Sequence, residues 1–545
     1  MNSPHAQPRP GQRRSRSTFS ILFFAILLLL VTAPLRAADD GIRSVVAATN
    51  LIEVSGFASA GPYRLVEFAP NQIPASARAT AIVARVTVAG DFSARFPRFD
   101  GARDRLYSSF MAWREADGTL TPAGTNRFVE DLRGIARFRD SFPVAASKKG
   151  LQVQMVDDAL ALGVKHAALN VNLTALVDLS ARSNSLPWLS GGRAYHFHRG
   201  PVDHLDRQIQ PLSQAGVVVS LILLTYASGE AALNKLMLHP DYDPKTPNRL
   251  GNFNTVTDEG VRQFTACLEF LANRYSQSGF PHGRAVNFII GNEVNSHWFW
   301  ANMGRVGMEA FADDYLRTVR LAHTALRQIA EAPRVYLSLE HHWNIRYPGG
   351  DARQTFPARP FLDYFHAQAQ AHGDFDWHVA FHPYPENLFR PATWNDQSAT
   401  TNENTPRITF KNLELLPRYF RRAEMRYRGQ PRHLILSEQG FHTPDGPEGE
   451  KLQAAAYAYA YYKTAQLDGI DSFILHRHVD HPHEGGLKLG LWKRDETKPN
   501  SAAPASRKQI YDVFLHADQP DWRQYFDFAL PVIGAQRWED LTRSP

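Results

Sequence analysis

The sequence predicts an α/β protein built on a (β/α)8 TIM barrel that follows a small all-β domain. From about residue 106 onward, short apolar segments alternate with helical patterns, which is typical of a parallel sheet. Eight of these segments fit strands, the number that closes such a barrel. Before residue 106, the chain holds only short β-branched or alternating segments separated by turn signals. We therefore expect a sandwich-like domain at 39–105 and the barrel at 106–545.

The barrel prediction depends on eight segments, each followed by enough chain for a helix. The predicted strands are 106–113, 166–171, 217–223, 286–290, 335–340, 377–382, 433–437 and 472–475. Helical patterns are clearest at 152–162, 202–214, 258–275 and 311–330. The first strand has the weakest signal, and the long remaining connections are expected to form loops on one face of the barrel.

Residues 1–38 have the order of a secretory signal peptide. A basic start that includes Arg13 and Arg14 precedes the apolar run 21–31, and small residues follow at Ala37 and Ala38. The run is shorter than the roughly 20 residues of a membrane-spanning helix. We predict a secreted or periplasmic protein that is cleaved near Ala38 and not inserted in the membrane, with an uncleaved anchor as the alternative.

Composition excludes several classes of function. The net charge of +6 comes mostly from five arginines before Ala38, so the body is close to neutral. It has no basic stripe of the kind that binds nucleic acid, and no nucleic-acid partner is expected. The single cysteine, Cys267, lies in a helical pattern, where it is expected to be a buried core residue. An exported chain with one cysteine forms no internal disulfide.

Two glutamates follow apolar strand segments at points far apart in the chain. Asn292 and Glu293 come after the segment 286–290, and Glu438 comes after 433–437. Polar residues at the C-terminal ends of barrel strands are typical of catalytic groups. A pair of carboxyl groups is what glycoside hydrolysis requires, one to protonate the leaving oxygen and one to attack the anomeric carbon. Each glutamate alone could equally be a strand-end residue in a salt bridge.

In this arrangement the chain resembles the clan A glycoside hydrolases, in which an Asn-Glu pair ends strand 4 and a Glu ends strand 7. It also resembles a related bacterial secreted family of unassigned activity. The resemblance covers most of residues 150–495 and implies that Glu293 is the acid/base and Glu438 the nucleophile of a retaining mechanism. It implies a carbohydrate substrate, and such a mechanism requires no cofactor or metal.

The resemblance extends to substrate-binding positions. It implies that Asn292 hydrogen-bonds a sugar hydroxyl and that Tyr384 donates to the nucleophile. Trp492 could be a platform for a sugar ring, and His297 and Trp298, with nearby Trp300, could form a rim. Aromatic faces suit sugars because they stack on the C–H surface of the ring.

Histidines after strands 5, 6 and 8 leave a second class of function open. His382, His476 and His478 are expected to contact sugar hydroxyls, but a metal-dependent hydrolase would also collect His and Asp at strand ends. Four histidines lie on the single loop 476–483, whereas metal sites in barrels draw ligands from several strands. We therefore predict no metal. A non-catalytic carbohydrate-binding barrel is the third class, and it would not need both glutamates.

Overall fold

The computed structural model describes residues 40–72, 78–132 and 134–541. The described residues all belong to one compact unit. The predicted signal peptide, 1–38, lies outside the described residues. Among the helices of the described part, none has both the length and the apolarity needed to cross a membrane.

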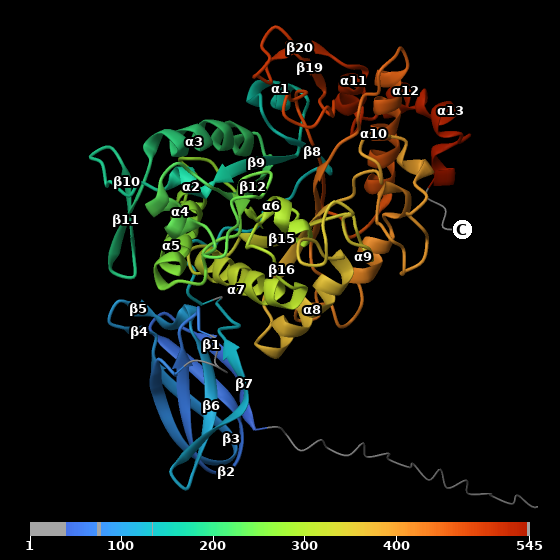
Figure 1. Cartoon of the computed structure of the whole chain (residues 1–545). Helices are drawn as coiled ribbons and strands as arrows, with labels where there is room; N and C mark the ends of the chain where they lie inside the picture. The colour runs from blue at the N-terminus through green and yellow to red at the C-terminus, as the bar shows by residue number, and fades with distance from the viewer. Residues whose placement is uncertain (1–39, 73–77, 133, 542–545) are drawn as a thin grey trace, which may run out of the picture. The chain divides into compact units, whose positions relative to one another are not determined.

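Eight parallel strands close into a barrel, which confirms the predicted fold class (Figure 1). Strand β18 pairs with β8, and β9 pairs with β12, so the sheet has no free edge along the barrel. The strands follow one another around the barrel as β8 (Lys149–Gln152), β9 (His166–Asn172), β12 (Val218–Tyr226), β14 (Asn287–Ile290), β15 (Arg334–Glu340), β16 (Trp377–His382), β17 (Leu434–Gln439) and β18 (Ser472–Leu475).

The helices of the barrel lie outside the strands (Figure 1). Helix α5 shows why they form where they do: the Thr257 side chain accepts a hydrogen bond from the Gly260 N–H, and two acids occupy the first turn. The helices are α1 (Val156–Ala161), α2 (Leu173–Leu176), α3 (Arg199–Gln214), α4 (Ala231–Met237), α5 (Asp258–Ser276), α6 (His297–Trp300), α7 (Met308–Arg327), α8 (Ala358–Ala371), α9 (Leu415–Phe420), α10 (Gly449–Gln466), α11 (Gln509–His516), α12 (Trp522–Phe526) and α13 (Ala529–Ile533).

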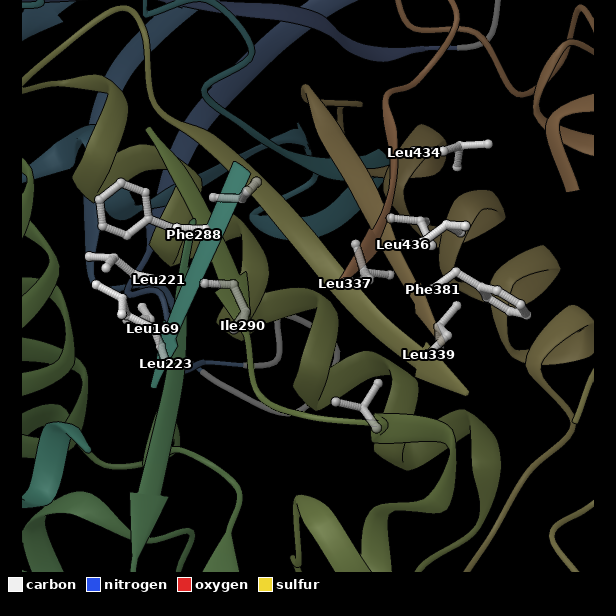
Figure 2. Packing of buried hydrophobic residues seen from close by; sticks show 14 of the residues in the cluster. Leu169, Leu221, Leu223, Phe288, Ile290, Leu337, Leu339, Phe381, Leu434 and Leu436 are labelled. Atoms are coloured by element: carbon white, nitrogen blue, oxygen red, sulfur yellow. The ribbon is translucent and has the colours of Figure 1, made fainter. Parts of the chain in front are cut away.

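Alternate residues of the strands pack in two separate cores. Side chains such as Leu169, Leu221, Leu337 and Phe381 belong to the core between strands and helices, and Figure 2 shows them beside the ribbons of the strands. Their neighbours along the strands point into the barrel. These inner residues include Ala168, Ile222, Ile289, Tyr336, Ala380, Ile435 and Ile474. This alternation determines which side chains reach the mouth of the barrel.

The predicted first strand, 106–113, is wrong. Residues Ser109–Ala116 form β6, which pairs antiparallel with β2 and β7 in the N-terminal sheet. The first barrel strand is β8, whose four residues include Gly150. A Cβ at Gly150 would come within 2.9 Å of His166 and Ile474, so the interior leaves room only for glycine there. This short strand, Lys149–Gln152, lacks the apolar run that the other barrel strands carry. Because β8 extends to Gln152, the first helix begins later than the predicted 152–162.

The strands before the barrel form a separate five-stranded antiparallel sheet with its own apolar core. Its members are β1 (Gly41–Ala47), β2 (Leu51–Phe68), β3 (Ala81–Pro97), β6 (Ser109–Ala116) and β7 (Thr119–Phe128). The all-β character of this segment is as predicted, but the sheet extends past the expected boundary at residue 105. Short pairs lie elsewhere: β4 (Phe99–Asp100) with β5 (Arg103–Asp104), β10 (Leu186–Ser190) with β11 (Arg193–Phe197), β13 (Leu250–Gly251) with β12, and β19 (Trp492–Arg494) with β20 (Pro504–Arg507).

Candidate active site

Glu293 is presented by an unusual turn at the end of β14. The strand stops at Ile290, and both Gly291 (φ 79°) and Glu293 (φ 40°) adopt left-handed backbone conformations. A non-glycine residue in this region is uncommon and is often found at functional sites. The backbone N–H of Glu293 donates to Ser338 Oγ on the neighbouring strand β15 at 2.9 Å. The strained turn is thus held from the adjacent strand.

The segment after Glu293 is anchored by a buried carboxylate, Glu340, at the end of β15. Asn295 Nδ2 and Ser296 Oγ donate to Glu340 Oε1 at 2.8 and 3.1 Å, and the His342 N–H donates to Oε2 at 2.9 Å. Burial would raise the pKa of Glu340, but the hydrogen bond and charge of His342 outweigh it and lower the pKa to about 2. Glu340 therefore stays ionised and positions the turn that carries Glu293.

His382, at the end of β16, is the direct partner of Glu293. Its Nδ1 lies 2.9 Å from Glu293 Oε1, and its Nε2 lies 3.0 Å from Ser437 Oγ. The imidazole is almost completely buried. We predicted a sugar contact for His382, whereas the structure places its two nitrogens on protein groups. With the proton on Nδ1, the ring donates to Glu293 and accepts the hydroxyl hydrogen of Ser437.

The pKa values of Glu293 and His382 shift together. Burial raises the pKa of Glu293, and the charges of Glu438 and Glu340 raise it further, against the lowering effect of His382. Burial lowers the pKa of His382, but the hydrogen bond to Glu293 and the nearby carboxylates outweigh it and raise the pKa. Because a hydrogen bond joins the two groups, the protonation of one affects the pKa of the other. A raised carboxyl pKa is what a general acid needs near neutral pH.

Replacing His382 with asparagine should move the alkaline limb of the pH profile to higher pH. The imidazole lowers the pKa of Glu293, so its removal raises that pKa, and the protonated acid survives to higher pH. The measurement is kcat/KM against pH, which reports the free enzyme. His378→Asn, a buried change on the same strand, is the control for folding. An unchanged limb, or a shift to lower pH, would contradict this assignment.

Glu438 lies on β17, where the pairing with β18 shifts register between Leu436 and Gln439. The Tyr384 hydroxyl donates to Glu438 Oε1 at 3.2 Å. Burial and the charges of Glu438 and Glu293 hold the pKa of Tyr384 well above its usual value, so it remains a donor. One carboxylate oxygen from each of Glu293 and Glu438, together with a ring nitrogen of His382, lie within 4.8 Å of one another. The structure thus brings the two predicted glutamates together.

Other groups line the mouth between β17 and β8. His476 Nε2 lies 2.9 Å from Glu484 Oε1, and His476 Nδ1 contacts Gln152 Oε1 at the end of β8. Arg477 also pairs with Glu484. Burial would raise the pKa of Glu484, but His476 and Arg477 lower it. Glu484 is a third carboxylate that the sequence reasoning missed, because it lies well past its strand on a long loop.

Burial of His297 and His478 corrects two predicted sugar contacts, and the indole nitrogen of a third predicted residue, Trp492, binds a protein group. His297 is fully buried and stacks on Phe356 with ring centroids 5.1 Å apart, and burial lowers its pKa to about 3. His478 Nε2 and Trp492 Nε1 both bind Asp158 Oδ2, at 2.8 and 2.9 Å. These polar atoms are therefore used inside the protein. Sequence position after a strand predicts the end of the barrel but not the direction of a side chain on a long loop.

The remaining predicted residues stay close to Glu293 in the chain. Asn292 and Trp298 are partly buried, and the Trp298 carbonyl accepts from Asn302 Nδ2 at 3.2 Å. Trp300 packs against the inner core of the barrel, as does Tyr226 at the end of β12. Burial and then the charge of Glu438 raise the pKa of Tyr226. Tyr226 had no motif to single it out.

Two groups of described residues could hold a metal ion: Glu340 with His341 and His342, and Glu293 with His382 and Glu438. Within the described residues, none of the histidines on the loop 476–483 belongs to such a group. That loop, which sequence reasoning weighed as a metal centre, instead supplies His476 to Glu484 and His478 to Asp158.

Comparison with protein families assigns the chain to one of them. The model described as "Family of unknown function (DUF5722)" matches residues 141–541. The chain belongs to this family. The match spans the whole barrel, from before β8 to beyond α13. The comparison with curated protein sequences gives no match.

Solved structures similar to this chain include several glycosidases. One is a family 39 glycoside hydrolase from the gut symbiont Bacteroides cellulosilyticus, with a TM-score of 0.42, 12% identity, and coverage of 88% of this chain and 80% of that one. A β-glucosidase from Pyrococcus furiosus has a TM-score of 0.41, 14% identity and coverage of 69% and 86%. A family 1 β-glucosidase from Thermotoga maritima has a TM-score of 0.42, 12% identity and coverage of 66% and 84%.

Proposed function

We propose that the protein is a retaining glycoside hydrolase that cleaves O-glycosidic bonds of an oligosaccharide or polysaccharide. The observation that carries the proposal is the placement of Glu293 and Glu438, whose oxygens lie within 4.8 Å at the C-terminal mouth of the barrel. Carboxyl groups about 5–5.5 Å apart suit retention, whereas inversion needs about 6.5–9.5 Å to admit a water. The short separation therefore favours double displacement.

The proposed reaction uses each group in a defined role. Glu438 attacks the anomeric carbon while the carboxyl proton of Glu293 passes to the leaving oxygen, so the glycosidic bond breaks as a glycosyl ester forms. Glu293, now ionised, takes a proton from water, which attacks the anomeric carbon and releases Glu438. Tyr384 orients the attacking carboxylate through its 3.2 Å hydrogen bond, and His382 tunes the proton affinity of Glu293.

The proposed function is tested with a library of aryl glycosides followed by natural oligosaccharides. NMR of the first product formed should show the anomeric configuration of the substrate. An inverted first product would overturn the double displacement. Binding of glycans without hydrolysis of any of them would favour the non-catalytic carbohydrate-binding barrel.

A metal-dependent hydrolase is the second candidate, favoured by the same cluster of side chains. Two carboxylates and one imidazole within 4.8 Å are ligand types that zinc and other transition metals accept. In that case the metal would activate a water, and the carboxylates would be ligands rather than nucleophile and acid. His382 Nδ1 would then turn from its 2.9 Å contact with Glu293 to the ion.

We expect activity to survive exhaustive chelation, because two carboxylates can carry out the reaction without a metal ion. A metallohydrolase would lose its activated water when the ion is removed. The measurement is hydrolysis before and after chelator treatment, with elemental analysis of the purified protein. Stoichiometric zinc or manganese, with activity lost to the chelator and restored by the same ion, would replace the two-glutamate mechanism.

We also propose that the protein acts outside the cytoplasm after removal of residues 1–38. The basic start, short apolar run and small residues before Asp39 support this. N-terminal sequencing of the protein from the envelope or secreted fraction should find Asp39 or a residue next to it. An intact Met1 in the membrane fraction would instead indicate an anchored protein.

A further inference from the structure

A polar groove of about 360 Å³ lies at the rim of the barrel beside β8 and β9. This volume is at the lower end of the roughly 300–1,000 Å³ typical of small-molecule sites. We call it the rim groove. The polar residues that line it include Gln152, Asn170, His204, Gln208 and Arg477.

The rim groove lies at the C-terminal ends of β8 and β9. Leu151 on β8 and Leu169 on β9 pack in the outer core, so the alternating Gln152 and Asn170 point to the inside. Ala168, which also lines the groove, belongs to the inner core. Residues from helix α3 complete the opposite wall. The groove therefore lies at the end of the barrel where the strands terminate, which is also the end that carries Glu293 and Glu438.

A chain of contacts links the rim groove to Glu484. Gln152 contacts His476, whose other nitrogen lies 2.9 Å from Glu484. The Tyr384 hydroxyl donates to Glu438, and the causes that raise the pKa of Tyr384 include burial and the charge of Glu484. Gln152 and Arg477, which line the groove, are therefore part of the contacts that hold Glu484 in place.

The lining of the rim groove suits the hydroxyl groups of a sugar. Amide side chains both donate and accept hydrogen bonds, as hydroxyls do. Gln152 Nε2 donates to Asn170 Oδ1 at 3.3 Å, but the Asn170 amide nitrogen and the side chains of Gln208 and His204 bond no other described residue. None of the groove's lining residues is an acid, and Arg477 is a cation. The groove is therefore polar, provided with free donors, and distinct from the carboxylates of the centre.

We infer that the rim groove binds a second sugar unit, next to the one whose glycosidic bond is cleaved. The inference rests on the proposed function and narrows its substrate class to oligosaccharides or polysaccharides rather than simple monosaccharide glycosides. Asn170 and Gln208 supply hydrogen bonds to ring hydroxyls, and Arg477 forms part of the wall. Neutral sugars and sugars that carry a carboxylate both present such hydroxyl groups, so the test includes both kinds.

The test measures binding with the full chain carrying Glu438→Ala, so that glycans are not consumed. A glycan array presents neutral, amino and uronic sugars in lengths of one to six units. We expect glycans of two or more units to bind about tenfold more tightly than single units, and Asn170→Ala with Gln208→Ala to abolish most of that difference. The neutral and uronic members show which kind of sugar the groove prefers.

Gln210→Ala is the matched control, because Gln210 lies on the same helix and its amide donates to the Pro281 carbonyl at 3.1 Å. This variant should keep the length preference. The inference is overturned if the array shows no length preference, or if the Asn170→Ala, Gln208→Ala protein binds like the control. Hydrolysis without length dependence would overturn it and leave the proposed function intact. Length-dependent binding by a protein that hydrolyses no glycan would support a sugar site in the groove and overturn the proposed function.

Discussion

Replacing Glu438 with alanine should lower turnover by about 10⁴-fold or more, because the change removes the proposed nucleophile. Carbohydrate binding should remain largely intact, since Tyr384, Glu484 and the rim groove are still in place. The measurement pairs kcat on the best substrate of the library with glycan affinity. Glu424→Ala, a change of an exposed glutamate, is the control and should retain activity.

Added azide sharpens this test. In the Glu438→Ala protein the small anion can enter the space left by the carboxylate and attack the anomeric carbon once, which gives a glycosyl azide of inverted configuration. Rescue of this kind needs a substrate with a good leaving group. Retention of full activity by Glu438→Ala would refute the nucleophile assignment, and a rescued product with retained configuration would place Glu438 in the acid/base role instead.

Replacing Glu293 with glutamine should slow hydrolysis of natural glycosides by about 10²–10⁴-fold, the usual contribution of general acid catalysis. Activated aryl glycosides, whose leaving groups need little protonation, should lose far less. The amide keeps the size of the side chain and can still contact His382, so the change affects the proton more than the structure. The measurement is the dependence of kcat/KM on the pKa of the leaving group.

Glu309→Gln is the control for Glu293→Gln, because Glu309 is an exposed glutamate at the start of α7. It should show the same leaving-group dependence as the unaltered protein. An equal loss on natural and activated substrates would argue against Glu293 as the acid. It would indicate instead that the residue maintains the turn held by Ser338 and Glu340.

Most of the barrel could be predicted from the sequence because its strands carry a local signal. The segments that became β9, β12, β15 and β16 are apolar runs that are buried on both faces, as parallel strands between helices must be. The first strand could not be predicted, because Lys149–Gln152 is short and contains Gly150. The requirement for glycine comes from His166 and Ile474, which only the closed barrel brings next to it.

The residues of the candidate site also include some that the sequence predicted correctly and some that it did not. Glu293 and Glu438 were found from their positions directly after apolar strands and Tyr384 from the family resemblance, and the structure gathers all three at one mouth. His297 and Trp492 had equally plausible positions, yet one is a core residue and the other binds Asp158. Both follow a strand by several residues, where regular alternation no longer determines direction.

The sequence by itself determined the parallel barrel and the chain positions of its two glutamates, because burial pattern and strand order are properties of local segments. The tertiary structure decided how the glutamates face one another, since Glu293 sits in a left-handed turn and Glu438 at a shift of strand register. It also decided that His382 forms a hydrogen bond with Glu293 and that the rim groove lies beside β9. These depend on contacts between residues far apart in the chain, and no local pattern encodes them.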